Sequence, residues 1–270
     1  MADKKITELT EVTTISDNDL FAVVTDTGTT PTTKKIKKSN IIPNVGIYGL
    51  KMIRVSDTAM TVSTGFTSLS DGTVINVSTA IAKTSLSLTA NTWYHVYLYL
   101  NSGTPDIEIV TTAPASPYYG TARAKTGDTS RRYVGSVLSG ATNKLTYWLH
   151  NTQTGLIAYT QEQDRTPYRV IEDGKAITET NVSCSAVVPI TSQLITIKLS
   201  NVDTTDILYI GNSEDGVTLA GDAGIYGINP LNYPVVIGFP LDSSQSFSYI
   251  YSSTPTTGLY ADVYGYYYER

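Results

Sequence analysis

The stretch NTWYHVYLYLNSG, residues 91–103, decides the fold class. Its run of aromatic and apolar side chains is the clearest β-strand signal in the chain. One face would carry Trp93, His95, Tyr97 and Tyr99, and the other would carry Tyr94, Val96, Leu98 and Leu100. PDIEIVTT follows after the Gly-containing loop NSGT, so we expect a β-hairpin here.

Similar short runs separated by turn residues fill the rest of the chain, without helical periodicity between them. Examples are KMIRVSDTAMTVSTG, RRYVGSVLSG, LITIKLSNV and SFSYIYSS. Strands at this spacing are typical of β-sandwiches and barrels. We therefore predict an all-β protein with a short N-terminal segment (1–44), a β-sandwich domain (45–160), a linker (161–172) and a C-terminal β-sandwich or jelly-roll-like domain (173–270).

The composition agrees with this class and excludes several functions. Charged residues make up only 16% of the 270 residues, where about 25% is usual, and Thr, Ser, Gly and 20 Tyr take their place. The net charge of −5 argues against a nucleic-acid binder, and the lysines at 34, 35, 37 and 38 are expected on a solvated face. No apolar run approaches the about 18 residues that span a bilayer, and the N-terminus lacks a signal-peptide core. The single cysteine, Cys184, is expected to be a small buried residue.

Residue patterns that support catalysis or metal binding are missing from the sequence. The two histidines, His95 and His150, lie in strand-like stretches without metal-site spacing. Phosphate-binding loops, a dinucleotide fingerprint and G-x-S-x-G are absent. We expect no enzyme activity, no cofactor and no metal.

Two carboxylate pairs remain as alternatives, because paired carboxylates support glycosidase chemistry. Asp106 and Glu108 alternate with Ile107 and Ile109, which predicts that the pair lies on the exposed face of a strand. Glu214 and Asp215 lie in a predicted turn. The surrounding NSEDGVTLAGD partly resembles a calcium loop, but it lacks the D-x-D-x-D-G spacing and the closing Glu.

Tyrosines crowd the C-terminal stretches SFSYIYSS and LYADVYGYYYER. Because Tyr combines an apolar ring with a hydroxyl that tolerates water, it is favoured at interfaces, although alternate tyrosines also pack sheet faces. In the YYY of residues 266–268, neighbouring tyrosines point to opposite faces of a strand, so both faces must be covered. We interpret these residues as a subunit interface or receptor contact, with the subunit interface favoured: Tyr249, Tyr251, Tyr260, Tyr264, Tyr266, Tyr267 and Tyr268.

Two stretches resemble virion proteins of tailed bacteriophages. KKITELTEVTTISDNDLFAVVTDTGTTPTTKKIKKSNI resembles their N-terminal segments in its KITEL start, its acidic step before LFAVV and its TKKIxxSNI end. TWYHVYLY and GDTSRRYVGSV are similar to a β module of phage fibre and minor structural proteins. The resemblance covers about the first 42 residues and most of the middle domain, and the C-terminal part is only loosely similar. The chain departs from long fibres, because it has neither heptads nor a long β-helix repeat.

The resemblance implies a virion structural protein, made in the host cytoplasm, that forms a short tail or head fibre. Its N-terminus would dock to tail or capsid proteins, its distal domain would contact the host surface, including a glycan, and it would be a homotrimer without membrane insertion. The alternatives are a capsid decoration or tail connector protein without receptor binding, and a glycan depolymerase. The anchor residues that we expect a virion partner to bury are Ile6, Leu9, Leu20, Phe21, Val23, Ile36 and Ile41.

Overall fold

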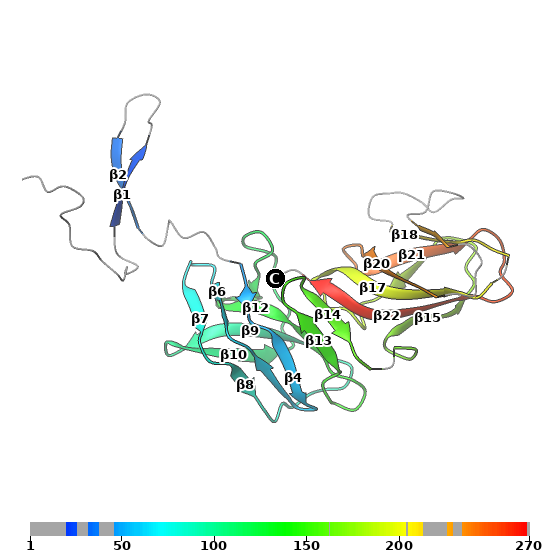
Figure 1. Cartoon of the computed structure of the whole chain (residues 1–270), viewed down its shortest axis with the longest axis horizontal. Helices are drawn as coiled ribbons and strands as arrows, with labels where there is room; N and C mark the ends of the chain where they lie inside the picture. The colour runs from blue at the N-terminus through cyan, green and yellow to red at the C-terminus, as the bar shows by residue number, and fades with distance from the viewer. Residues whose placement is uncertain are drawn as a thin grey trace, which may run out of the picture.

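The computed structural model describes residues 20–25, 32–37, 46–161, 163–203, 205–212, 226–228 and 234–268 (Figure 1). The regular elements in these ranges are all β-strands, and each strand pairing is antiparallel. The predicted all-β class is therefore confirmed. No helix in the described part of the chain is long and apolar enough to cross a membrane.

The predicted strand at residues 93–101 lies inside a four-stranded sheet. The strand order is β10 (Thr104–Val110), β9 (Trp93–Asn101), β12 (Asp128–Leu138) and β11 (Ala124–Lys125). The expected hairpin across NSGT is confirmed as the β9–β10 pair. The central part of β9 is buried from Tyr94 to Leu98, so both of its faces are covered.

Two small sheets accompany this one. The first contains β3 (Tyr48–Gly49), β6 (Gly65–Ser68) and β7 (Val74–Val77), and the second contains β4 (Met52–Ser56), β5 (Ala59–Val62) and β8 (Ile81–Lys83). Their buried side chains, among them Met52, Met60 and Ile75, belong to the same apolar cluster as Val96 and Leu98 of β9. These residues form the part of the cluster that is the core of the N-terminal half of the molecule.

The C-terminal half is a sandwich of two sheets. The six-stranded sheet has the order β13 (Trp148–Asn151), β14 (Leu156–Tyr159), β22 (Leu259–Tyr268), β17 (Ser192–Asn201) and β20 (Val235–Pro240), with β15 (Arg169–Gly174) also paired to β22. The four-stranded sheet has the order β16 (Thr180–Ser183), β21 (Ser246–Tyr251), β18 (Leu208–Gly211) and β19 (Tyr226–Ile228).

Ring and hydrogen-bond contacts show that the two sheets face each other. The Phe239 ring of β20 meets the Phe247 ring of β21 edge to face at 6.1 Å. The Tyr251 hydroxyl of β21 donates to Asn201 Oδ1 of β17 at 2.9 Å. Apolar rings thus pack between the sheets. The buried Tyr251 hydroxyl is paired with Asn201, which avoids the free-energy cost of an unpaired buried polar group.

Strand β22 also joins the two halves (Figure 1). The Tyr266 hydroxyl donates to the Ser136 carbonyl at 3.0 Å, and the Tyr268 hydroxyl donates to the Val134 carbonyl of β12 at 2.9 Å. Gly135 lies between these acceptors, and a Cβ there would come within 2.8 Å of the Tyr268 hydroxyl. The missing side chain is therefore what lets β22 approach β12 so closely.

The predicted domain boundaries fall within this arrangement. Strand β14, in the predicted 45–160 domain, pairs with β22 of the predicted 173–270 domain. Strand β15 begins at Arg169, inside the predicted 161–172 linker. The buried apolar residues form one cluster that runs from Leu50 to Tyr268. The described part of the chain thus has a continuous core across residues 160–172.

In the predicted 1–44 segment, the structure describes β1 (Leu20–Thr25) and β2 (Thr32–Lys37). They pair antiparallel, with Phe21 opposite Ile36 and Val23 opposite Lys34, and form a two-stranded sheet. Strand β1 contains the LFAVV stretch, and the lysine-rich stretch that follows it is the second strand of the pair.

Candidate functional site

The predicted anchor residues are described only in part. Ile6, Leu9 and Ile41 lie outside the described residues, and the other four contribute only their backbone positions in β1 and β2. Lys34, which lies opposite the anchor position Val23 in the β1–β2 pairing, is exposed. Burial of the anchor by a partner stays a prediction.

The C-terminal tyrosines divide into two groups. Tyr249, Tyr251, Tyr266 and Tyr268 are between 1% and 7% exposed and belong to the core. As core residues of this chain they have no accessible ring to offer a receptor or a second subunit, which corrects the sequence interpretation for these four. Tyr260, Tyr264 and Tyr267 are half-buried, and for them the interface stays a prediction. The physical reason is the sandwich itself, because β22 and β21 are covered on both faces by their own chain.

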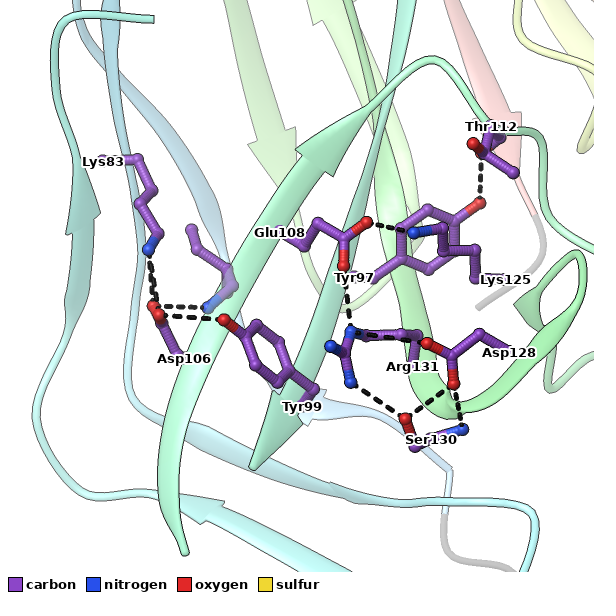
Figure 2. Close-up of polar contacts among 11 residues, drawn as sticks. Lys83, Tyr97, Tyr99, Asp106, Glu108, Thr112, Lys125, Asp128, Ser130 and Arg131 are labelled. Carbon is purple, nitrogen blue, oxygen red and sulfur yellow. Dashed lines mark hydrogen bonds and ion pairs between the residues drawn. The ribbon is translucent and has the colours of Figure 1, made fainter. Parts of the chain in front are cut away.

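The carboxylate pair Asp106 and Glu108 lies in β10, within a network of charges (Figure 2). Asp106 accepts from Lys83 Nζ at 3.0 Å, from the Tyr99 hydroxyl at 3.2 Å and from the Ile107 N–H at 2.8 Å. Glu108 pairs with Lys125 Nζ and accepts from Arg131 Nε at 2.9 Å. The side chains of both carboxylates are 22% exposed, so the pair lies on a partly covered face rather than a fully exposed one.

Arg131 links this network across β9 to β12. Its guanidinium lies over the Tyr99 ring, 3.8 Å from the centroid, and its Nη1 donates to Ser130 Oγ at 2.9 Å. Ser130 in turn donates to Asp128 Oδ1 at 2.6 Å. A cation held over an aromatic face and paired to a carboxylate is fixed in position, so the network stabilises the order β10–β9–β12.

The electrostatics of the pair do not favour acid catalysis. Burial alone would raise the pKa of Asp106, but hydrogen bonds from Lys83, the Ile107 N–H and Tyr99 outweigh it and lower the pKa. Burial would likewise raise the pKa of Glu108, and Lys125 and Arg131 lower it below its usual range. A glycosidase needs one carboxylic acid with a raised pKa to protonate the leaving group. In this pair both carboxyl groups are held ionised.

The other residues singled out by sequence are structural or lie outside the described ranges. His95 Nδ1 shares a 2.7 Å hydrogen bond with Ser136 Oγ, and His150 Nδ1 accepts from the Met52 N–H at 3.0 Å. Cys184 is buried, as expected, and burial raises the pKa of its thiol to about 12. Glu214 and Asp215, with most of the NSEDGVTLAGD loop, lie outside the described residues. Within the described ranges, no group of three or more His, Cys, Asp or Glu residues could hold a metal ion.

Two of the cavities where described residues of the two halves of the molecule meet are of interest for ligand binding. One, of about 470 Å³, is polar and is lined by residues that include Arg123, Ser192 and Asp242. The other, of about 600 Å³, is lined by Trp93 of β9, by the segment after β12 and by Gln161, Thr166, Pro167 and Tyr168. Both volumes are in the range of small-molecule sites.

We call the larger cavity the Trp93 pocket, and its geometry makes it the candidate functional site. The Trp93 indole N–H donates to the Ser185 carbonyl at 3.1 Å, which fixes the ring at the start of β9. Gln161 Oε1 accepts from the Tyr147 N–H at 3.1 Å, which fixes that amide. Such fixed aromatic and amide groups can recognise a ligand that has both apolar and hydroxyl-bearing faces.

No family model, no curated protein and no solved structure matches this chain. The candidate site therefore rests on the geometry of this chain alone.

The sequence interpretation missed the Trp93 pocket because its walls come from segments far apart in the chain. The predicted linker 161–172 contributes Thr166, Pro167 and Tyr168. The one signal in the sequence was the presence of Gln and Thr-Pro-Tyr in an otherwise patternless stretch. No motif connects these residues with Trp93, which lies about seventy residues earlier in the chain.

Proposed function

We propose that this chain is a structural protein of a tailed-bacteriophage particle, a short fibre attached to the tail or head through residues 1–44. The resemblance of that segment to phage N-terminal segments is the first support. The β-rich body, with its charged network and its continuous core, suits a stable projecting appendage. The ionised carboxylates of β10 agree with a role in binding and assembly rather than in hydrolysis.

The observation that carries the proposal is the isolation of the β1–β2 sheet. Among the described strands, β1 and β2 pair only with each other. A lone two-stranded hairpin is marginally stable in water, whereas three or more strands or a packed surface stabilise one. A second protein that covers β1–β2, or extends it by a strand, would supply the stabilisation that the other described strands do not give it.

Deletion of residues 1–44 tests the attachment. We expect the 45–270 protein to be folded, with the circular dichroism and unfolding transition of the full chain, but to be absent from purified particles assembled in host cells. The matched control is a fusion of residues 1–44 to a fluorescent protein, which we expect in the particles. Incorporation of the 45–270 protein at full level would contradict the proposal.

Particles that lack the chain distinguish a fibre from a decoration or connector protein. If the body contacts the host, particles that lack the chain should adsorb to host cells less well than complete particles. If they adsorb normally but lose integrity on heating or in low salt, the decoration or connector function replaces the fibre. Sedimentation of the full-length protein tests the proposed trimer.

A further inference from the structure

The Trp93 pocket is lined by uncharged residues. Its described lining residues include no charged side chain; they are apolar groups, amides and hydroxyls. Trp93 supplies the large aromatic ring, Asn91 and Gln161 supply amides, and Thr146 and Thr166 supply hydroxyls. A site without a cation is a poor place for phosphate or carboxylate, which are recognised by Arg, Lys or helix N-termini.

A buried hydroxyl at the pocket has no partner inside the described part of the protein. Tyr168 is 1% exposed and lines the pocket, and its hydroxyl makes no hydrogen bond. Burial raises the pKa of Tyr168 to about 12, and the nearby Thr146 hydroxyl lowers it slightly. Thr146 Oγ1 donates its own proton to the Leu138 carbonyl at 3.1 Å. A buried hydroxyl without a partner destabilises the fold, and such groups are exceptions in native structures.

The Gln161 amide and the Trp93 indole are held in place before any ligand arrives. The Trp93 indole N–H is bound to Ser185, so its ring faces are what remain for contact. Gln161 is oriented by its Oε1 contact with the Tyr147 N–H, which leaves Nε2 as the donor end of the amide. Fixed groups lower the entropic cost of binding, since fewer rotamers are lost when a ligand enters.

We propose that the Trp93 pocket binds a neutral saccharide unit. A pyranose ring has an apolar C–H face, which suits the Trp93 ring, and a rim of hydroxyls that both donate and accept. Asn91 and Gln161 offer both donors and acceptors to that rim. The volume of about 600 Å³ admits one or two sugar rings.

This inference names the ligand class for the host contact of the proposed fibre, and it rests on the proposed function only for the source of the saccharide. The pocket itself is tested with free sugars, whereas the fibre is tested by incorporation into particles. If the pocket binds sugar but the chain is not incorporated into particles, the fibre proposal is contradicted and the saccharide proposal is not. If the chain is incorporated into particles but binds no sugar, the saccharide proposal is contradicted and the fibre proposal is not.

Ligand-observed NMR of the full-length protein with glucose, galactose and N-acetylglucosamine, each alone at millimolar concentration, tests the pocket. We expect saturation transfer to at least one of them, strongest at protons of one ring face. Trp93→Ala should weaken that binding about tenfold or more, which is about 1.4 kcal/mol, and Trp93→Phe should weaken it less. Tyr119→Ala, which removes a 57% exposed ring outside the pocket, is the matched control and should leave binding unchanged.

Three results would overturn the proposal. They are saturation transfer to none of the three sugars, equal binding by wild type and Trp93→Ala, and equal losses in Trp93→Ala and Tyr119→Ala. If circular dichroism shows that Trp93→Ala does not fold, Gln161→Ala takes its place with the same expectation. For a sugar that binds, competition by purified host cell-wall polysaccharide shows whether the source is a cell surface or free sugar.

Discussion

Trp93 and Tyr266 meet edge to face, with ring centroids 5.9 Å apart and an angle of 85° between the rings. The Trp93 ring lines the pocket, while Tyr266 is buried in β22 and donates to the Ser136 carbonyl. An edge-to-face pair of this kind adds about 0.5–1.5 kcal/mol beyond the area it buries. Tyr266, which the sequence placed at an interface, is therefore a buried residue that packs against Trp93 and holds its ring in position.

Gly135→Ala tests the close approach of β22 to β12. The new Cβ would meet the Met52 side chain and lie 2.8 Å from the Tyr268 hydroxyl, so both must shift. Overpacking of this kind costs about 1–3 kcal/mol, and we expect that loss in the free energy of unfolding measured with urea. Gly140→Ala is the matched control, because its Cβ would have no neighbour closer than 3.9 Å. Equal effects of the two substitutions would argue against a close contact at Gly135.

Asp262→Asn tests the ion cluster on β22. The Asp262 side chain is 1% exposed and accepts from Arg169 Nε at 2.8 Å and Nη2 at 3.3 Å, with Lys198 Nζ at 3.5 Å. Removing its charge leaves two partly covered cations without their partner. We expect a loss of about 3 kcal/mol in unfolding free energy. Asp164→Asn, in an exposed ion pair with Arg165, should lose much less, and a smaller loss for Asp262→Asn than for Asp164→Asn would contradict the assignment.

His95 should make the fold pH-dependent below neutrality. Burial lowers the pKa of His95 from 6.5 to about 4. Between these values the unfolded chain binds a proton that the folded chain does not, so stability falls as the pH drops from about 6.5 toward 4. Linkage gives a loss of about 2 kcal/mol between pH 7 and pH 5. Urea unfolding at the two pH values should show it, and His95→Gln should remove most of the difference; an unchanged difference in the variant would assign it to other groups.

Glu108→Gln separates a structural carboxylate from a catalytic one. Because Lys125 and Arg131 hold Glu108 ionised, we expect no release of reducing sugar from host polysaccharide by the wild-type protein. The variant should lower the free energy of unfolding and weaken its dependence on salt, since it breaks a charge network on the sheet. Sugar release by the wild type that disappears in Glu108→Gln would restore the depolymerase alternative.

The sequence was sufficient to predict the fold class, because the strand signals are local. The apolar run in residues 91–103 and the Gly loop within it predicted the β9–β10 hairpin. The pairing of β14 with β22 joins residues more than one hundred positions apart, and no local pattern encodes it. The same distance hid the burial of Tyr266 and Tyr268, whose covering strands lie elsewhere in the chain.

The candidate site was less predictable than the fold. Trp93 stood out as part of a strand, but its neighbours in the pocket come from a stretch that reads as a linker. Asp106 and Glu108 were correctly placed on one strand, whereas their cations Lys83, Lys125 and Arg131 lie on three other strands. The pairing of the strands determines which cations lie beside Asp106 and Glu108, and a single sequence does not show which strands pair.

Cross-linking of intact particles tests the central proposal most directly. Lys34 is exposed in β2, so an amine-reactive cross-linker can reach it. In purified particles, mass spectrometry should find Lys34 linked to a different virion protein, while body lysines such as Lys144 give links only within the chain or between its copies. Absence of the chain from particles, or links to other virion proteins from the body and none from residues 1–44, would contradict N-terminal attachment.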